Sequence, residues 1–186
     1  GNVGSFAVKF LEEAGARVVA IADSRGTAYK KEGLDFKKML ATKSKKGSVA
    51  EYPGADKLTR DEIFGLPVDI LIPATVTDVI NDSNKNKIKA KIIVEGANIP
   101  MREYVEEELV KKGILIVPDF VANSGGVVSS YAEYMGYGPK KMFEIVKEKV
   151  VRATREVVKE TLKTKRNPRA VAMELAARKV ERGGKR

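Results

Sequence analysis

Short, largely apolar runs that alternate with amphipathic helical segments constrain the fold of this chain more than any other feature. The runs cover residues 17–22, 68–72, 91–94 and 114–117, and each is followed by an acidic residue or a proline. Apolar runs of this length suit parallel strands that are buried on both faces. Because they alternate with helices at the spacing of βαβ units, we expect an α/β fold with a doubly wound parallel sheet.

The helical segments between and after these runs are indicated by apolar periodicity and by end signals. Gly15 is placed as the C-cap of the first helix, and residues 59–62 (TRDE) form a capping box. Helices are expected over residues 6–14, 35–42, 100–112, 139–163 and 168–182, together with a short helix that the capping box opens before Pro67. Residues 123–134 are expected to form a loop that passes into a helix. The last two are expected to pack outside the sheet, and the tail RGGKR is expected to fray.

The composition excludes several classes of site. The chain of 186 residues contains no Cys and no His, so disulfides, thiolate metal sites, Cys nucleophiles, His-based triads and His-ligated zinc are ruled out. We expect no metal. Charged residues make up 32% of the chain, against about 25% in average proteins. Together with the absence of Cys and Gln, this bias resembles that of proteins from thermophiles.

The net charge of +10 raises the question of a nucleic-acid partner. The basic clusters after residue 140 are interleaved with Glu144, Glu148, Glu156 and Glu160, which at helical spacing is typical of an ion-paired, solvated helix face. We therefore expect no nucleic-acid partner. No apolar run approaches the roughly 18 residues needed to span a bilayer, and no signal peptide is present, so we expect no membrane association and a cytoplasmic location.

A glycine-bearing corner opens the chain. Gly1-Asn2-Val3-Gly4 precedes a helix, and Asp23 follows the first apolar run, nineteen residues after Gly4. Glycines allow a pyrophosphate to approach the backbone, the helix N-terminus supplies N–H groups, and an acid at this distance binds the adenosine ribose. The alternative is a tight turn that only caps the helix.

The full motif is G-x-G-x-x-G, and its first glycine and the strand before it are missing. We therefore expect a Rossmann-like domain over residues 1–138 that lacks its first, central strand, with residues 139–186 as C-terminal helices of the same unit. Loss of that strand would expose the edges of its neighbours, so the chain is expected to be a fragment or a mis-started gene product.

Three further segments carry a family resemblance. They are Pro73-Ala74-Thr75, residues 94–98 (VEGAN), and residues 118–131 (PDFVANSGGVVSSY). With GNVG and the ADSRG loop, in this order, they resemble the C-terminal, coenzyme-binding domain of the glutamate, leucine, phenylalanine and valine dehydrogenases, and of glutamate dehydrogenase above all.

The resemblance implies roles for the coenzyme-binding residues. Gly1 to Gly4 would hold the pyrophosphate and the nearby ribose. Asp23 and Ser24 would contact the adenosine ribose, whereas Ser24 and Arg25 would suit a 2′-phosphate, so the choice between NAD and NADP stays open. Ala74 and Thr75 would line the coenzyme crevice, and Asn98 and Asn123 would hydrogen-bond around the nicotinamide end.

For the substrate, the resemblance implies that Ser130 binds the side-chain carboxylate of glutamate and that Val127 forms a wall of the same pocket. Each assignment has a structural alternative: Asn98 and Asn123 as loop ties, Ser130 as a solvated helix residue, and Val127 as packing. Tyr131 to Tyr134 depart from the bulky aromatic pair usual in the family.

The implied reaction is the NAD(P)-dependent oxidative deamination of glutamate to 2-oxoglutarate and ammonia. The family's catalytic lysine and aspartate lie in a preceding domain, so we expect no catalytic residue here and an inactive isolated chain. A homohexamer is implied for a full-length protein. The alternative is a stand-alone NAD(P)-binding module without catalysis.

Overall fold

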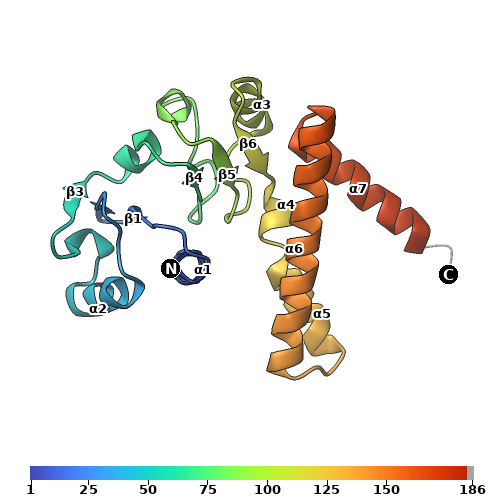
Figure 1. The fold of residues 1–186 in the computed structure, drawn as a ribbon, viewed down its shortest axis with the longest axis horizontal. Helices are drawn as coiled ribbons and strands as arrows, with labels where there is room; N and C mark the ends of the chain where they lie inside the picture. Colours follow the sequence, from blue (N-terminus) through green and yellow to red (C-terminus); the bar gives the residue numbers. More distant parts are fainter. Residues whose placement is uncertain (184–186) are drawn as a thin grey trace. The chain divides into compact units, whose positions relative to one another are not determined.

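The chain folds into two units, each built on its own three-stranded sheet (Figure 1). The structure is a computed structural model that describes residues 1–183. The first unit comprises Gly1–Asp69 and Asp82–Ala90, and the second comprises Ile70–Asn81 and the chain from Lys91 onward. The tail RGGKR is expected to fray, and its residues 184–186 lie outside the described part of the chain.

The first unit contains an antiparallel sheet with the order β1-β2-β3. Its elements are α1 (Asn2–Glu13), β1 (Ala20–Asp23), β2 (Gly26–Tyr29), α2 (Phe36–Lys46), η1 (Val49–Glu51), β3 (Asp56–Leu58), η2 (Asp61–Gly65) and η3 (Lys85–Lys87). Ala28, Met39, Val49 and Tyr52 are buried in the core between the sheet, α2 and η1.

A tight hairpin joins β1 to β2 through Ser24 and Arg25, with Asp23 opposite Gly26. Gly26 has a φ of 148°, and a Cβ at this position would lie 3.0 Å from the Leu58 carbonyl oxygen. Only glycine meets both conditions without strain, because it has no Cβ and tolerates positive φ. The hairpin brings β2 back alongside the end of β1 that carries Asp23.

The second unit contains a parallel sheet with the order β4-β5-β6. Its elements are β4 (Ile70–Leu71), β5 (Ile92–Val94), α3 (Glu103–Lys111), β6 (Leu115–Val117), α4 (Asp119–Ala122), α5 (Gly125–Tyr134), α6 (Pro139–Thr164) and α7 (Pro168–Gly183). Ile93 and Ile116 in the sheet are fully buried. Val157 of α6 and Ala172 of α7 pack with Val117 and Val121 in a common core.

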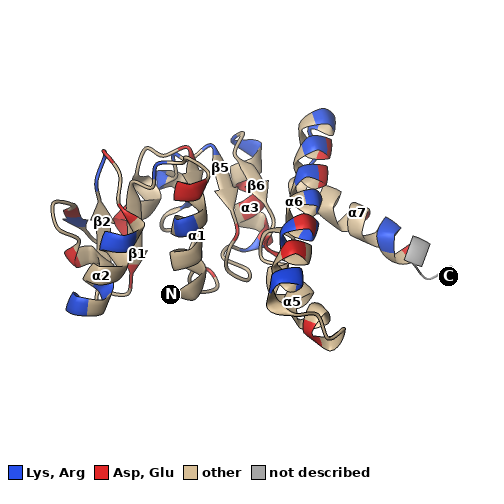
Figure 2. Ribbon diagram, turned by 60° about the horizontal axis from the view of Figure 1, so that its bottom comes forward, with Lys and Arg blue, Asp and Glu red and all other residues tan. Residues whose placement is uncertain are grey.

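The long helix α6 carries the interleaved charges expected from its sequence. Figure 2 shows Lys/Arg and Asp/Glu side by side along it. Glu148 pairs with Arg152 at 3.6 Å one turn apart, and Glu156 pairs with Lys179 of α7 at 2.6 Å. No helix among residues 1–183 is long and apolar enough to cross a membrane.

The α/β class and the parallel sheet are confirmed, but the sheet is less continuous than expected. The strand expected over residues 17–22 forms as β1, yet it pairs with β2, an antiparallel strand that the sequence did not indicate. β1 and β4 are both edge strands. No strand among residues 1–183 joins the two sheets.

The first helix also differs from its expected packing. It forms as α1 and ends at Glu13 with Ala14 as its C-cap, one residue before the predicted Gly15, which follows with a φ of 80°; Val8 is the only buried residue of α1. Phe6 and Phe10 of the expected apolar stripe stack on each other and are more than half exposed. Apolar periodicity predicted the helix correctly, but it did not predict which residues of the helix are buried by the rest of the described chain.

Candidate functional site

Three segments, two loops and the short helix α4, begin at one edge of the parallel sheet, where β4, β5 and β6 end. Residues 73–75 follow β4, residues 95–98 follow β5, and residues 118–123 follow β6. The Ala97 N–H donates to the Pro73 carbonyl at 2.9 Å, which ties the first two loops together. Parallel strands deliver their carboxyl ends to the same edge, and ligands of open α/β sheets bind there.

Asn98 and Asn123 are brought together at this edge. The Asn123 side-chain amide donates to the Asn98 side-chain oxygen at 2.7 Å. Asn98 and Thr75 are exposed, whereas Ala74 is half-buried beside Gly96. The two predicted nicotinamide contacts are therefore neighbours, and the remaining amide groups of the pair are available to a ligand.

The residue after Asn98 is held in an unusual conformation. Ile99 has a φ of 46°, which is rare for a β-branched residue. Its N–H donates to Asp119 Oδ2 at 2.9 Å, and its carbonyl accepts from the Asp78 N–H at 3.0 Å. Backbone strain of this kind persists only where surrounding contacts enforce it.

The predicted substrate contacts lie on α5, directly after these loops. Val127 is 77% exposed, and Ser130 is exposed with its hydroxyl donating to the Gly126 carbonyl at 3.2 Å. Val127 is therefore not packed within the described residues. The Ser130 hydroxyl has a helical partner of its own, from which it can rotate toward a ligand.

The first unit carries the other predicted coenzyme contacts. Gly1 precedes α1, and the first helical hydrogen bond runs from the Ser5 N–H to the Gly1 carbonyl at 3.0 Å. The N–H groups of the preceding helical residues therefore point out of the helix end. A Cβ at Gly1 or Gly4 would meet nothing within 4 Å, so no other described residue crowds these two glycines.

Asp23 lies at the end of β1, as predicted, but its carboxylate is already engaged. Oδ2 accepts from Lys43 Nζ at 2.5 Å and from the Val49 N–H at 3.0 Å. Oδ1 accepts from the Ser48 hydroxyl at 2.9 Å and from the Arg25 N–H at 3.0 Å.

All four acceptor positions of Asp23 are filled from within the chain, so a ribose hydroxyl must displace one of these donors. Burial alone would raise the pKa of the Asp23 carboxyl, but the four hydrogen bonds together lower it to about 2. Ser24 and Arg25, in the adjoining turn, are exposed.

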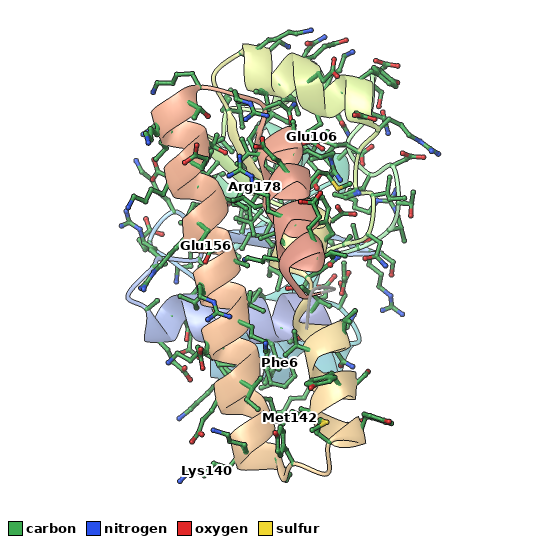
Figure 3. All side chains as sticks on the ribbon, turned by 90° about the vertical axis from the view of Figure 1, so that its right-hand side faces the viewer. Phe6, Glu106, Lys140, Met142, Glu156 and Arg178 are labelled. Atoms are coloured by element: carbon green, nitrogen blue, oxygen red, sulfur yellow. The ribbon has the colours of Figure 1, made fainter. Side chains whose placement is uncertain are left out.

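The sequence did not single out a buried ionic cluster in the second unit, which we call the Arg169 cluster. Arg169, in the first turn of α7, directs each guanidinium nitrogen to a different carboxylate. Nη2 contacts Glu95 at 2.9 Å, Nε contacts Glu106 at 2.6 Å, and Nη1 contacts Asp119 at 3.1 Å. Figure 3 shows Glu106 beside the start of α7.

The cluster holds three carboxylates around one cation, and their pKa values diverge. Burial and the neighbouring Glu106 raise the pKa of Glu95 to about 7. Burial also raises the pKa of Glu106, whereas the N–H groups of Ile99 and Phe120 and the Arg169 charge outweigh the burial of Asp119 and lower its pKa. One sequence signal did exist: an acid that directly follows a buried strand, such as Glu95, needs a partner.

A parallel sheet whose strand-end loops carry these polar groups defines a Rossmann-like, nucleotide-binding type of fold. The chain belongs to the Glutamate/Leucine/Phenylalanine/Valine dehydrogenase family, whose model matches residues 1–185.

Curated relatives match about three quarters of the chain. It is 51% identical over 135 residues to a glutamate dehydrogenase of Aeropyrum pernix, covering 73% of this chain and 32% of that protein. It is 46% identical over 134 residues to an NADP-specific glutamate dehydrogenase of Saccharolobus shibatae, covering 72% of this chain and 32% of that protein. The chain thus spans about a third of the length of these relatives.

Solved structures agree over nearly the whole chain. The hetero-hexameric glutamate dehydrogenase of Thermus thermophilus matches with a TM-score of 0.83 at 29% identity, covering 98% of this chain and 44% of that one. The L-tryptophan dehydrogenase of Nostoc punctiforme matches with a TM-score of 0.76 at 25% identity, covering 100% of this chain and 50% of that one.

Proposed function

We propose that this chain forms the coenzyme-binding part of an NAD(P)-dependent amino-acid dehydrogenase that deaminates glutamate to 2-oxoglutarate and ammonia. The observation that carries the proposal is the Asn98–Asn123 pair at the carboxyl edge of the parallel sheet. Family membership and the names of the relatives support the choice of reaction. The coenzyme supplies the hydride chemistry, and the residues of this chain bind and orient it.

Each unit has its own part in this proposal. In the first unit, Gly1 to Gly4 and the N-terminus of α1 bind the pyrophosphate, and Asp23 and Ser24 contact the adenosine ribose. In the second, Ala74 and Thr75 line the coenzyme crevice, and Asn98 and Asn123 contact the nicotinamide end. These assignments rest on the motif positions and on the open, polar surroundings of the residues.

The surroundings of Asp23 favour use of both coenzymes. A free carboxylate repels a 2′-phosphate, but Lys43 compensates the charge of Asp23, and Arg25 lies in the adjoining turn. The NADP-specific relative at 46% identity supports the binding of NADP. We therefore propose that both NAD and NADP bind.

Ser130 and Val127 are proposed to contact the substrate, with Ser130 donating to the side-chain carboxylate of glutamate. A hydroxyl placed for a carboxylate is left unpaired by an apolar substrate, which favours glutamate over leucine or phenylalanine. The intact protein is further proposed to be a homo-oligomer of six subunits; the Thermus thermophilus enzyme, a hetero-hexamer, supports the number of subunits. Its mass in solution tests this assembly.

The direct test is a titration of the intact protein with NADH and NADPH, followed by fluorescence, together with glutamate-dependent reduction of NAD⁺ and NADP⁺. We expect micromolar binding of both coenzymes and turnover that requires glutamate. Binding without turnover of any amino acid would support a binding module instead of a dehydrogenase. Absence of binding would overturn the proposal.

The substrate role is tested by Ser130→Ala in the intact protein. We expect a rise of about tenfold in the KM for glutamate with a smaller change in the KM for coenzyme, because one hydrogen bond to a charged group is lost. Ser129→Ala is the matched control, since both hydroxyls donate to the Gly126 carbonyl. Equal effects of the two substitutions would mean that the Ser130 hydroxyl bonds only within α5 and does not contact the substrate.

A further inference from the structure

The Arg169 cluster connects α7 to the coenzyme edge of the sheet through hydrogen bonds and the peptide bond between Asn98 and Ile99. Arg169 Nη1 contacts Asp119 Oδ1 at 3.1 Å. The other oxygen of Asp119 accepts from the Ile99 N–H at 2.9 Å. Ile99 directly follows Asn98, whose side chain accepts from Asn123 at 2.7 Å.

Burial makes this connection firm. The side chains of Glu95 and Glu106 are 0% and 1% exposed, and that of Arg169 is 23% exposed. Glu95 Oε2 also accepts from the Asp119 N–H at 2.8 Å, so the cluster holds Asp119 by its backbone as well as by its carboxylate. The guanidinium also lies over the Phe120 ring, 5.5 Å from its centroid. A planar group with donors on three sides is required to hold three carboxylates at once.

The strain at Ile99 shows what the cluster has to hold. A β-branched residue at a φ of 46° returns to an extended conformation unless its neighbours prevent it. Its N–H is held by Asp119, and its carbonyl by the Asp78 N–H. Relaxation of Ile99 would rotate the peptide that follows Asn98 and so displace the Asn98 side chain from Asn123.

We propose that Arg169 is a positioning residue for the coenzyme, holding Asn98 in its binding orientation through Asp119 and the strained backbone of Ile99. The proposal rests on the proposed function, because it assumes that Asn98 contacts the nicotinamide end. Arg169 itself touches no ligand in this arrangement. Glu95 and Glu106 keep the guanidinium from turning away from Asp119.

The experiment combines Arg169→Met with Asn98→Ala in a double-mutant cycle on the intact protein, read out as the Kd for NADH. Arg169→Met alone should raise the Kd about tenfold, and Asn98→Ala should raise it by a similar factor. If Arg169 acts through Asn98, adding Arg169→Met to Asn98→Ala should change the Kd less than twofold. Independent, multiplicative effects would overturn the proposal.

Hydrogen exchange gives a second readout that needs no coenzyme. The Ile99 amide should exchange at least tenfold faster in Arg169→Met than in the unmodified protein, while amides in α6 keep their protection. Unchanged exchange at Ile99 would overturn the proposal. If the unmodified protein binds no NADH but Ile99 exchange responds as expected, the proposed function fails and the structural link from Arg169 to Ile99 stands.

Two further variants guard against a general folding defect. Arg166→Met removes a neighbouring, half-exposed arginine that pairs with Glu174 at 2.8 Å, and it should change neither readout by more than twofold. Arg169→Lys keeps the charge but not the three-way geometry. If Arg169→Met does not fold, the same cycle with Arg169→Lys should show a smaller loss that again depends on Asn98, and additivity there would equally overturn the proposal.

Discussion

The two units place carboxylates in opposite situations. In the first unit, one carboxylate, Asp23, receives four hydrogen bonds, and its pKa falls to about 2. In the second, Glu95, Glu106 and Asp119 share Arg169, two buried carboxylate oxygens have no partner, and the pKa of Glu95 rises to about 7. A fully paired acid stabilises the ionised fold, whereas crowded acids constrain geometry and work against their own ionisation.

The largest expected effect comes from removing the one cation of the Arg169 cluster. Arg169→Met leaves three buried carboxylates without a counter-ion, so the free energy of unfolding should fall by about 4 kcal/mol at pH 7. Urea unfolding measures this loss. Arg178→Met is the control: Arg178 is 59% exposed and pairs with Glu174 in the same helix, so it should cost less than about 1 kcal/mol. Equal losses would mean that the Arg169 cluster contributes no more to the free energy of unfolding than an exposed ion pair does.

A smaller effect, with a distinctive pH dependence, is expected for Glu95→Gln. The pKa of Glu95 is about 7 in the folded protein, against an ordinary value of 4.5. Between pH 4.5 and pH 7, the folded protein therefore keeps a proton on Glu95 that the unfolded chain has released. The free energy of unfolding should therefore fall by about 2–3 kcal/mol from pH 4.5 to pH 7, and Glu95→Gln should remove most of that fall. Unfolding at several pH values tests this.

The control for Glu95 is Glu133→Gln, which replaces an exposed glutamate of α5. It should leave the pH profile unchanged. If Glu95→Gln also leaves the pH dependence of unfolding unchanged, then Glu95 is not the group that takes up a proton between pH 7 and pH 4.5.

The smallest effect is expected in the first unit, and it has the opposite pH dependence. The folded pKa of Asp23 lies below its ordinary value, so its contribution is present above pH 3.8 and is lost as the pH falls toward 2. Asp23→Asn should cost about 1–2 kcal/mol at pH 7, since Lys43 is partly exposed, and almost nothing at pH 2. Asp56→Asn, at an exposed position of β3, should cost little at either pH. A loss that persists at pH 2 would mean that packing, and not charge, makes Asp23 important.

The buried strands and long helices could be predicted because apolar periodicity reports burial directly. The strands expected at residues 91–94 and 114–117 form as β5 and β6, and the last two helices form within two residues of their expected ends. β2 and β3 were missed for the same reason. Residues 26–29 contain no apolar run, and residues 56–58 lie on an exposed edge, so neither segment carries a periodic signal.

The candidate site was partly predictable for a different reason. Short motifs located Asp23 and Asn98 at or just after strand ends and Asn123 after the short helix that follows β6, because such positions follow from the order of strands and turns. Arg169 was not predictable, since it lies 50 residues from Asp119 and 74 from Glu95 along the chain. Nothing in a helix that begins NPRAVA indicates which of its charges is buried.

The left-handed backbone at Ile99 has a consequence for laboratory evolution. A selection for heat resistance rewards any residue that adopts this conformation at lower cost, so glycine or asparagine should be enriched at position 99. Glycine would also enlarge the set of shapes open to the neighbouring Asn98. Libraries screened for survival at high temperature alone should therefore accumulate robust variants with poor coenzyme affinity, and screens that include turnover should retain isoleucine.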